Sequence, residues 1–565
     1  MLTALSLGNF KAFGEAQRLP IRPLTLIFGA NSSGKSSLIH GLLFGRQAVD
    51  AGDLDVQRTE IGGDSVDLGG FRQYVHRRDP FQQVEWGVRL DASRFSGRLA
   101  ELMAAVQRVD CSLTIGITVD NRGQPTRDAA PEVRSYRIEG DGELLVAMSR
   151  RRGGAFRIDR LDHRHPVFRA VLRALVESAT TARELTTGDY AGLDETVDRL
   201  VPQLSVQTGG FLPAGLARPE PFLGAAGAGG LVPIRRGQRA ADLAGAVEIF
   251  LPRALDELIG GLSDSVTAEL RRLRYLGPLR SYPPRHLAFT QHHDSNWLAG
   301  GGYAWDTLRR DATVRAAVNE WLGAEWLKTP YELRLQELIN IDDLDAPLLN
   351  ALATMNEETI GPMLASFKNL ALDASSETEE EEDDEPDDDL DIGLEVERIK
   401  GWIRSADIDR IQELVLVDQR SGTEVSHRDV GIGISQVLPV LVGAFAERNS
   451  IVAIEQPEIH LHPALQAELG DVFIRSALGE LQNTFILETH SEHLILRIMR
   501  RIRDTVDERL PEGLPPVHPR DVAILYVQPE GSASVVRELR LDEEGQFLDP
   551  WPDGFFEEGF RERFS

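Results

Sequence analysis

The feature that most constrains this chain is an eight-residue pattern near its N-terminus, set between two apolar segments. Residues 24–29 read LTLIFG, an apolar run of strand length, and residues 36–49 have the composition of an apolar helix. From Gly29 to Ser36 the sequence is GANSSGKS, which fits G-x-x-x-x-G-K-[ST]. Backbone N–H groups in such a loop face phosphates at a helix N-terminus. The pattern therefore predicts a strand, loop and helix that bind a nucleotide such as ATP together with Mg²⁺.

The predicted contacts run through this loop and into the helix. Lys35 is expected to reach the β and γ phosphates, and the Ser36 hydroxyl to bind Mg²⁺. A glycine-rich turn that only caps a helix is the alternative, and the flanking strand and helix patterns argue against it. The predicted ATP-binding residues here are Gly29, Ala30, Asn31, Ser32, Ser33, Gly34, Lys35, Ser36 and Ser37.

A second apolar strand pattern, 451–454, leads into Glu455, Gln456 and Glu458. Ligands of open α/β sheets lie at the carboxyl ends of the strands, so Glu455 is expected to meet the Mg²⁺ held by Ser36. A core strand with a solvated acidic end is the better explanation of this segment alone. The presence of the glycine-rich loop elsewhere in the chain instead favours a metal-binding role for Glu455.

A third apolar pattern, 484–488, is followed by His490. A lone histidine is more often structural, but one at the end of a strand beside a nucleotide site can contact the γ-phosphate or the attacking water. The candidate catalytic residues are therefore Gln456, Glu458 and His490.

Strand and helix patterns alternate in the C-terminal third, which predicts an α/β fold with a parallel, doubly wound sheet. The strands are expected at 413–418, 450–455, 484–489 and 521–527. Alternating patterns between residues 82 and 159 predict an antiparallel sheet, and 160–270 is mostly helical in pattern.

Composition bounds the class of protein. At 565 residues the chain exceeds what one core fills, so several domains or large insertions are expected. No apolar run has the length of a membrane span and no secretory leader pattern is present, which predicts a cytoplasmic protein. The single cysteine, Cys111, excludes a disulfide framework.

The net charge of −28 is unfavourable for DNA binding. However, 12 of the acidic residues fall within 377–391, a segment expected to be a disordered linker.

Five motifs at both ends and in the middle of the chain form one set. They are Asn9-Phe10-Lys11, GANSSGKSS at 29–37, VGIGISQVLP at 430–439, IEQPEIHLHP at 454–463 and ETHSEHL at 488–494. Together they resemble the SMC, RecF and OLD branch of ABC ATPase heads. YLGPLRSYPPR at 275–285 and WPDGFFEE at 551–558 resemble a subgroup of bacterial ATPases that carry a C-terminal domain of unknown function and are often linked to antiphage defence.

The resemblance implies an ABC-type P-loop ATPase head, an α/β fold with a mixed or parallel sheet and helices on both faces. The sequence patterns add an antiparallel β subdomain and a largely helical insertion. It implies a homodimer in which two ATP molecules lie between the phosphate loop of one subunit and the signature segment of the other. Glu455 then corresponds to the metal-binding acid and His490 to the switch histidine. Asn9 and Lys11 join the ATP-binding set. Gln73 is the candidate for the lid glutamine beside the γ-phosphate and metal.

The register of the signature segment stays open. The family presents a serine followed by a glycine, and two readings fit here. Gly431 with Gly433 agrees better by distance, whereas Gly433 with Ser435 supplies a hydroxyl.

This sequence departs from the resembled family at the catalytic base. The residue after the metal-binding acid is usually a glutamate, but here it is Gln456, which cannot accept a proton. Hydrolysis is then slow, or Glu458 replaces the base.

The expected domain organisation follows these motifs. An N-terminal ATPase lobe covers 1–160, a mostly helical insertion 161–270, its second part 271–370, an acidic disordered linker 371–393, a C-terminal ATPase lobe 394–507 and a family-specific tail 508–565.

The leading functional expectation is an ATP-driven dimerising switch with slow hydrolysis. It would serve as the sensor ATPase of an antiphage or DNA-transaction system, with a separately encoded effector such as a nuclease; higher oligomers and DNA binding stay open. The alternative is an ATP-binding scaffold without significant turnover. No Asp-x-Asp follows His490, which argues against a nuclease within this chain.

Overall fold

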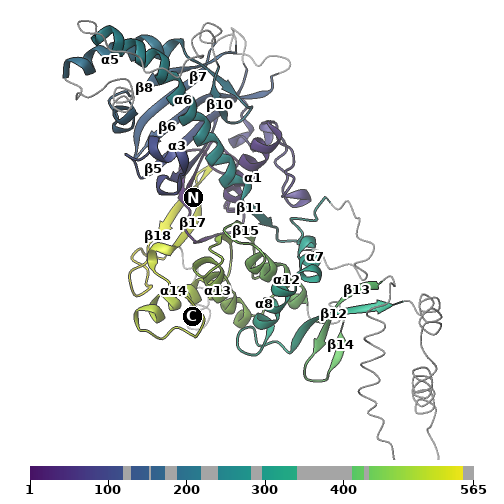
Figure 1. Ribbon diagram of the computed structural model, residues 1–565. Helices are drawn as coiled ribbons and strands as arrows, with labels where there is room; N and C mark the ends of the chain where they lie inside the picture. Colours follow the sequence, from purple (N-terminus) through teal and green to yellow (C-terminus); the bar gives the residue numbers. More distant parts are fainter. Residues whose placement is uncertain are drawn as a thin grey trace, which may run out of the picture.

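Two sheets organise the part of the chain that the structure describes. The structure is a computed structural model, and it describes residues 1–118, 129–151, 154–171, 187–217, 239–280, 295–339, 410–425, 430 and 432–551. One sheet has nine strands and the other has six. Figure 1 shows how the strands and helices are arranged.

The apolar run after the N-terminal hairpin becomes β3 (Leu24–Gly29), whose residues are all buried inside the six-stranded sheet. The strand order is β11-β15-β16-β3-β17-β18, and every neighbouring pair is parallel except β17 with β18. The other strands are β11 (Leu273–Leu276), β15 (Ile451–Glu455), β16 (Thr484–Glu488), β17 (Val522–Glu530) and β18 (Ala533–Leu539). The predicted parallel α/β core is confirmed, and it joins the two ends of the chain.

Both faces of this sheet are covered. Alternate side chains of each strand point to opposite sides, and each side packs into its own core. Leu26 and Phe28 belong to a core with the C-terminal helices, whereas Ile27 belongs to a core shared with the nine-stranded sheet. Helix α1 (Ser36–Ala51) contributes to the second core. The helices of the first core are α7 (Gly302–Arg310), α8 (Ala312–Leu322), α12 (Ile432–Phe445), α13 (Pro463–Leu478) and α14 (Glu492–Val506).

The nine-stranded sheet has the order β10-β9-β8-β7-β6-β5-β4-β1-β2, and its neighbouring strands are antiparallel. The predicted antiparallel subdomain is therefore confirmed. Its strands are β1 (Leu2–Gly8), β2 (Gln17–Pro20), β4 (Val84–Asp91), β5 (Arg108–Ile117), β6 (Pro131–Gly140), β7 (Glu143–Arg150), β8 (Phe156–Leu161), β9 (Ser205–Thr208) and β10 (Pro213–Leu216).

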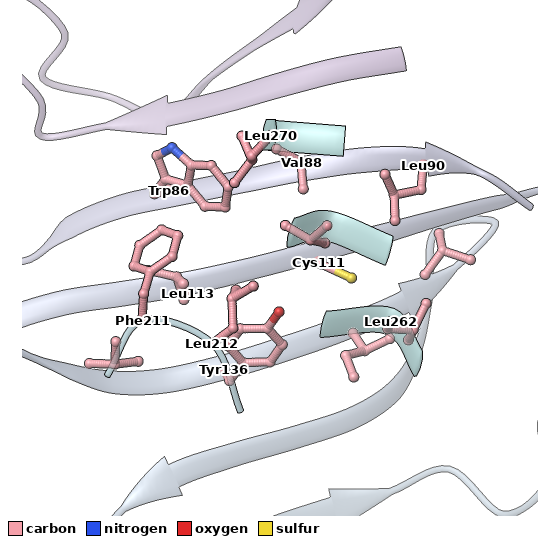
Figure 2. Close-up of a cluster of buried hydrophobic side chains, with 14 of the residues drawn as sticks. Trp86, Val88, Leu90, Cys111, Leu113, Tyr136, Phe211, Leu212, Leu262 and Leu270 are labelled. Atoms are coloured by element: carbon pink, nitrogen blue, oxygen red, sulfur yellow. The ribbon is translucent and has the colours of Figure 1, made fainter. Parts of the chain in front are cut away.

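Helix α6 (Arg239–Arg271) packs on this sheet and carries much of the expected helical insertion together with α5 (Thr187–Leu200). Figure 2 shows Trp86, Cys111 and Tyr136 of the sheet beside Leu262 and Leu270 of the helix. The insertion is not purely helical, since β9 and β10 form its hairpin at the sheet edge.

One local expectation was wrong. The strand expected at 413–418 is β13 (Arg410–Asp418), but it lies outside the parallel sheet in an antiparallel three-stranded sheet with β12 (Tyr331–Ile339) and β14 (Thr423–Val425). Asn9 and Lys11 follow β1, which ends at Gly8, and both have positive φ values, 50° and 46°, typical of a turn.

Some predicted segments lie outside the described residues. These are the acidic linker 371–393, Gly431 and the tail beyond residue 551. Within the described residues, no helix combines the length and apolar character needed to cross a bilayer.

Candidate nucleotide-binding site

The phosphate loop connects β3 to α1 in a shape that only glycine permits at two positions. Gly29 has φ +146°, and a Cβ there would lie 2.2 Å from the Val527 carbonyl oxygen. Gly34 has φ +93°, and a Cβ there would lie 2.4 Å from the Ala12 Cβ. Both are conformations and contacts that a side chain excludes. The strand, loop and helix predicted from the sequence are thus present, with Ala30, Asn31 and Ser32 exposed and Ser33 and Ser37 buried.

Lys35 is folded back onto this loop. Its side chain is buried, and Nζ donates to the carbonyl oxygens of Gly29 at 3.1 Å and Ala30 at 2.9 Å. Burial lowers its pKa, and the negative charges of Glu488 and Glu458 oppose that shift. The ammonium therefore occupies a pocket of acceptors and carboxylates at the loop.

Glu455 ends β15 and lies one strand away from the loop strand, because β16 runs between them. Its Oε1 accepts a hydrogen bond from the Tyr275 hydroxyl at 2.9 Å and lies 3.6 Å from His40 Nε2. Burial, reinforced by Glu488, raises the pKa of Glu455 to about 7. The acid expected to hold the metal is thus buried and hydrogen-bonded to Tyr275, with a neutral His40 beside it.

Glu488 was not predicted from the sequence as a site residue, although it ends the apolar run 484–488. Its carboxylate accepts a hydrogen bond from Ser36, and Lys35 lies close enough to oppose the rise in its pKa that burial causes. Ser36 therefore contacts Glu488, an acid that the sequence analysis did not place at the metal. The signal available in the sequence was the unusual acid at the end of an apolar strand.

Gln456 is fixed through its backbone. It adopts φ +47°, its N–H donates to the Glu488 carbonyl oxygen at 2.7 Å, and its own carbonyl accepts from Arg280 Nη2 at 3.0 Å. The turn after β15 is thereby tied to β16, with the Gln456 side chain half-buried.

Glu458 and His490 are joined directly. The His490 backbone N–H donates to Glu458 Oε1 at 2.6 Å, and the Thr489 side chain bonds the same carboxylate. Burial raises the pKa of Glu458 despite these bonds. Burial and the charge of Lys35 lower the pKa of His490, so its imidazole is neutral at pH 7.

Arg280 is a second residue that sequence reasoning did not single out. It is 7% exposed and donates to the carbonyl oxygens of Gln436, Glu455 and Gln456 at 3.0–3.2 Å. Burial lowers its pKa to about 10. This guanidinium connects the end of β15 to the first turns of α12.

Lys11 reaches toward the same region from the turn after β1. Its Nζ lies 2.8 Å from His40 Nδ1, and burial lowers its pKa to about 8. Lys11 and Gln73 both line a cavity of about 470 Å³, whereas the Asn9 side chain is bonded to the Gln83 carbonyl oxygen. Lys11 is thus placed beside the predicted metal-binding acid, and Gln73 on the wall of the neighbouring cavity.

In the signature segment, Gly433 and Ser435 both lie in the first turns of α12. A Cβ on Gly433 would lie 2.8 Å from the His460 carbonyl oxygen, so the helix packs closely on that loop. Ser435 is 1% exposed and Ile432 is 43% exposed.

Family models match two parts of the chain. Residues 273–497 match the family described as "AAA domain, putative AbiEii toxin, Type IV TA system", and residues 517–562 match "Protein of unknown function (DUF3696)". The phosphate loop, the strand order above and the match at residues 273–497 together identify the fold. The described residues have the fold of an ABC-type P-loop ATPase head.

Solved structures similar to this ABC-type head come from SMC proteins. One is the Smc head bound to the C-winged helix domain of ScpA, with a TM-score of 0.33 and 10% identity over 96% of this chain and 98% of that chain. A second is the Pyrococcus furiosus Smc head with an extended coiled coil bound to the C-terminal domain of ScpA, with a TM-score of 0.32 and 11% identity over 95% of this chain and 96% of that chain. A third is the Thermotoga maritima SMC head, with a TM-score of 0.32 and 8% identity over 96% of this chain and 99% of that chain. At TM-scores this low, the assignment rests on the loop, the strand order and the family match. No curated protein matches the chain.

Proposed function

We propose that this chain binds MgATP at the Lys35 loop and hydrolyses it slowly, as a switch that dimerises head to head. The observation that carries the proposal is the loop itself, in which Lys35 is buried against two carbonyl oxygens and faces the carboxylates of Glu458 and Glu488. A triphosphate offers stronger acceptors for the lysine than those carbonyls.

The donors present fit a magnesium ion. Ser36 supplies a hydroxyl, and one oxygen of Glu488 is buried without a hydrogen-bond partner. Among the described residues no group of three or more His, Cys, Asp or Glu forms a metal cage. Mg²⁺ bound with ATP takes only one or two carboxylates and completes its shell with phosphate and water, so the cluster suits it. When bound, it would neutralise charge on the phosphates; Ser36, Glu455 and Gln73 are the metal-site residues predicted from the sequence.

Glu458 is the residue we assign to water activation. Its Oε2 is buried without a partner, and a raised pKa makes the carboxylate a better proton acceptor. Gln456 holds the turn through its backbone and has an amide that orients water but takes no proton. The neutral imidazole of His490 is suited to a hydrogen bond with the γ-phosphate or that water.

The start of α12 is the surface that we assign to the partner's nucleotide. An exposed Ile432 and the helix N-terminus are available there, and helix N-termini attract phosphate. The Ser435 hydroxyl is buried within the chain, which favours the register of Gly431 with Gly433 over that of Gly433 with Ser435.

A regulatory scaffold that binds ATP without turnover is the second candidate, and Gln456 at the usual base position favours it. Phosphate release by the wild type under saturating MgATP separates the two, with Lys35→Ala as the blank. Turnover above that blank supports the switch. ATP binding without release supports the scaffold.

We infer further that the head serves a bacterial antiphage or DNA-transaction system in the cytoplasm, acting on a separately encoded effector. The support is the sequence resemblance and the family matched at residues 517–562. Co-purification with the products of neighbouring reading frames, with and without MgATP, tests this. Loss of the effector in Lys35→Ala is the expected result, and equal recovery with both proteins would contradict a nucleotide-controlled switch.

A further inference from the structure

Glu488 lies between the two strands that the nucleotide site is expected to use. In the parallel sheet it is paired with Glu455 of β15 on one side and with Ile27 of β3 on the other. The phosphate loop begins directly after β3. The sheet therefore places this carboxylate nearer to the loop strand than the carboxylate of Glu455.

The contacts of Glu488 and Glu455 agree with the sheet order. Glu488 accepts a hydrogen bond from the Ser36 hydroxyl. The Oε1 atom of Glu455 is instead engaged by Tyr275, with His40 beside it. The hydroxyl predicted to bind Mg²⁺ is thus already in contact with Glu488.

The second oxygen of Glu488 has no partner. Glu488 is 5% exposed, yet its Oε2 accepts no hydrogen bond. A buried, unpaired carboxylate oxygen is costly to the fold, and buried polar groups nearly always find a partner. A hard divalent cation is the ligand that such an oxygen beside a hydroxyl suits best.

We propose that Glu488 is a direct carboxylate ligand of the Mg²⁺ that accompanies ATP, sharing the ion with Ser36. This inference rests on the proposed function and deepens it, because it moves the principal acidic ligand from the end of β15 to the end of β16. Glu455, fixed by Tyr275, then has a supporting position in the site.

The test measures metal binding directly, with Mn²⁺ as the probe and a non-hydrolysable ATP analogue as the nucleotide. Mn²⁺ affinity in this ternary complex is read by electron paramagnetic resonance for the wild type and Glu488→Gln. The amide retains an acceptor for Ser36 but loses the charge. We expect Mn²⁺ affinity to fall by at least about tenfold, since even outer-shell partners of metal sites are worth 10–100-fold. Affinity for the nucleotide in EDTA should stay within about threefold.

Glu458→Gln is the matched control, because it removes an equal buried charge nearby that has no bond to Ser36. A direct ligand predicts a much smaller loss of Mn²⁺ affinity in this control. Equal losses in both variants, or none in Glu488→Gln, would overturn the inference. If Glu488→Gln does not fold, Glu488→Asp keeps the charge but shortens the side chain and should show the same selective loss.

The outcome is separable from the proposed function. If the wild-type complex takes up no Mn²⁺ with the nucleotide, the MgATP site itself is wrong. If the wild type binds Mn²⁺ and Glu488→Gln matches it, only the role of Glu488 is wrong.

Discussion

Asp110 in the nine-stranded sheet and Glu488 in the six-stranded sheet are buried to nearly the same extent, at 7% and 5% exposure, but their partners differ. Asp110 Oδ1 accepts from Arg18 and Arg89, and Oδ2 accepts from Arg89, each at 3.0 Å. Glu488 has one hydrogen-bonded oxygen and one without a partner. The first carboxylate is fully paired within the fold.

The difference separates a structural acid from a candidate ligand-binding acid. A buried carboxylate with complete pairing contributes to the fold, and losing it leaves arginines unpaired. Incomplete pairing costs stability until something else binds. Glu458 shares this property with Glu488, and both lie at the carboxyl edge of the parallel sheet. That edge is where α/β sheets bind ligands.

The largest expected effect concerns the catalytic base. Glu458→Gln should lower steady-state phosphate release at saturating ATP by about 10²–10⁴-fold, because the amide cannot take a proton. Gln456→Glu should change the rate little. ATP binding should survive in both variants, which isolates the chemical step.

The reverse outcome has a clear meaning. If Gln456→Glu raises turnover by about 10²-fold and Glu458→Gln leaves it unchanged, the base belongs at position 456 and Glu458 is structural, like Asp110. If neither variant alters the rate, His490 is the next residue to test.

The next effect concerns the cation that faces these acids. Lys35→Ala should weaken ATP binding by about 10²-fold, since hydrogen bonds to charged groups contribute roughly 1.5–3 kcal/mol. Lys328→Ala, which removes an exposed lysine outside the loop sequence, is the control. Equilibrium titration with a fluorescent ATP analogue measures both. Wild-type affinity in a folded Lys35→Ala protein would refute the phosphate-loop assignment.

The sequence predicted the elements that local pattern determines. The strand, loop and helix around Lys35 follow from glycine geometry and apolar spacing, and β15 and β16 were visible as short apolar runs. β13 was placed in the wrong sheet because its apolar run reveals a strand but not its partner, which here is β12. Partner choice depends on long-range packing that one segment does not encode.

The site was predictable in part for the same reason. Glu455 and His490 were predicted as site residues because strand ends of a parallel sheet converge. Glu488 was missed because its significance depends on the order β15-β16-β3, which brings it to Ser36. Arg280 was missed because its role comes from three backbone carbonyls contributed by residues more than 150 positions away in the sequence.

A smaller effect tests Asp110, the fully paired acid of the comparison. Asp110→Asn should destabilise the protein by about 1–3 kcal/mol, because Arg18 and Arg89 lose a charged partner in a partly exposed network. Glu488→Gln should leave the melting temperature of the metal-free protein equal or higher. Calorimetry on both variants in EDTA measures this. A larger loss of stability in Glu488→Gln would place Glu488 among the structural acids.

The last effect is a pH dependence at the edge of the parallel sheet. The pKa of Glu455 is about 7 in the fold, above its ordinary value of 4.5. The folded state therefore holds a proton that the unfolded chain releases, and this contribution to stability is complete below pH 4.5 and lost as pH rises through 7. In EDTA, the wild-type melting temperature should fall between pH 5 and pH 7.5 by a few degrees more than that of Glu455→Gln. The comparison between the two proteins cancels the titration of the remaining acids. Parallel curves would show that Tyr275 and His40 already stabilise the ionised carboxylate, so that Glu455 resembles Asp110 and not the unpaired acids beside it.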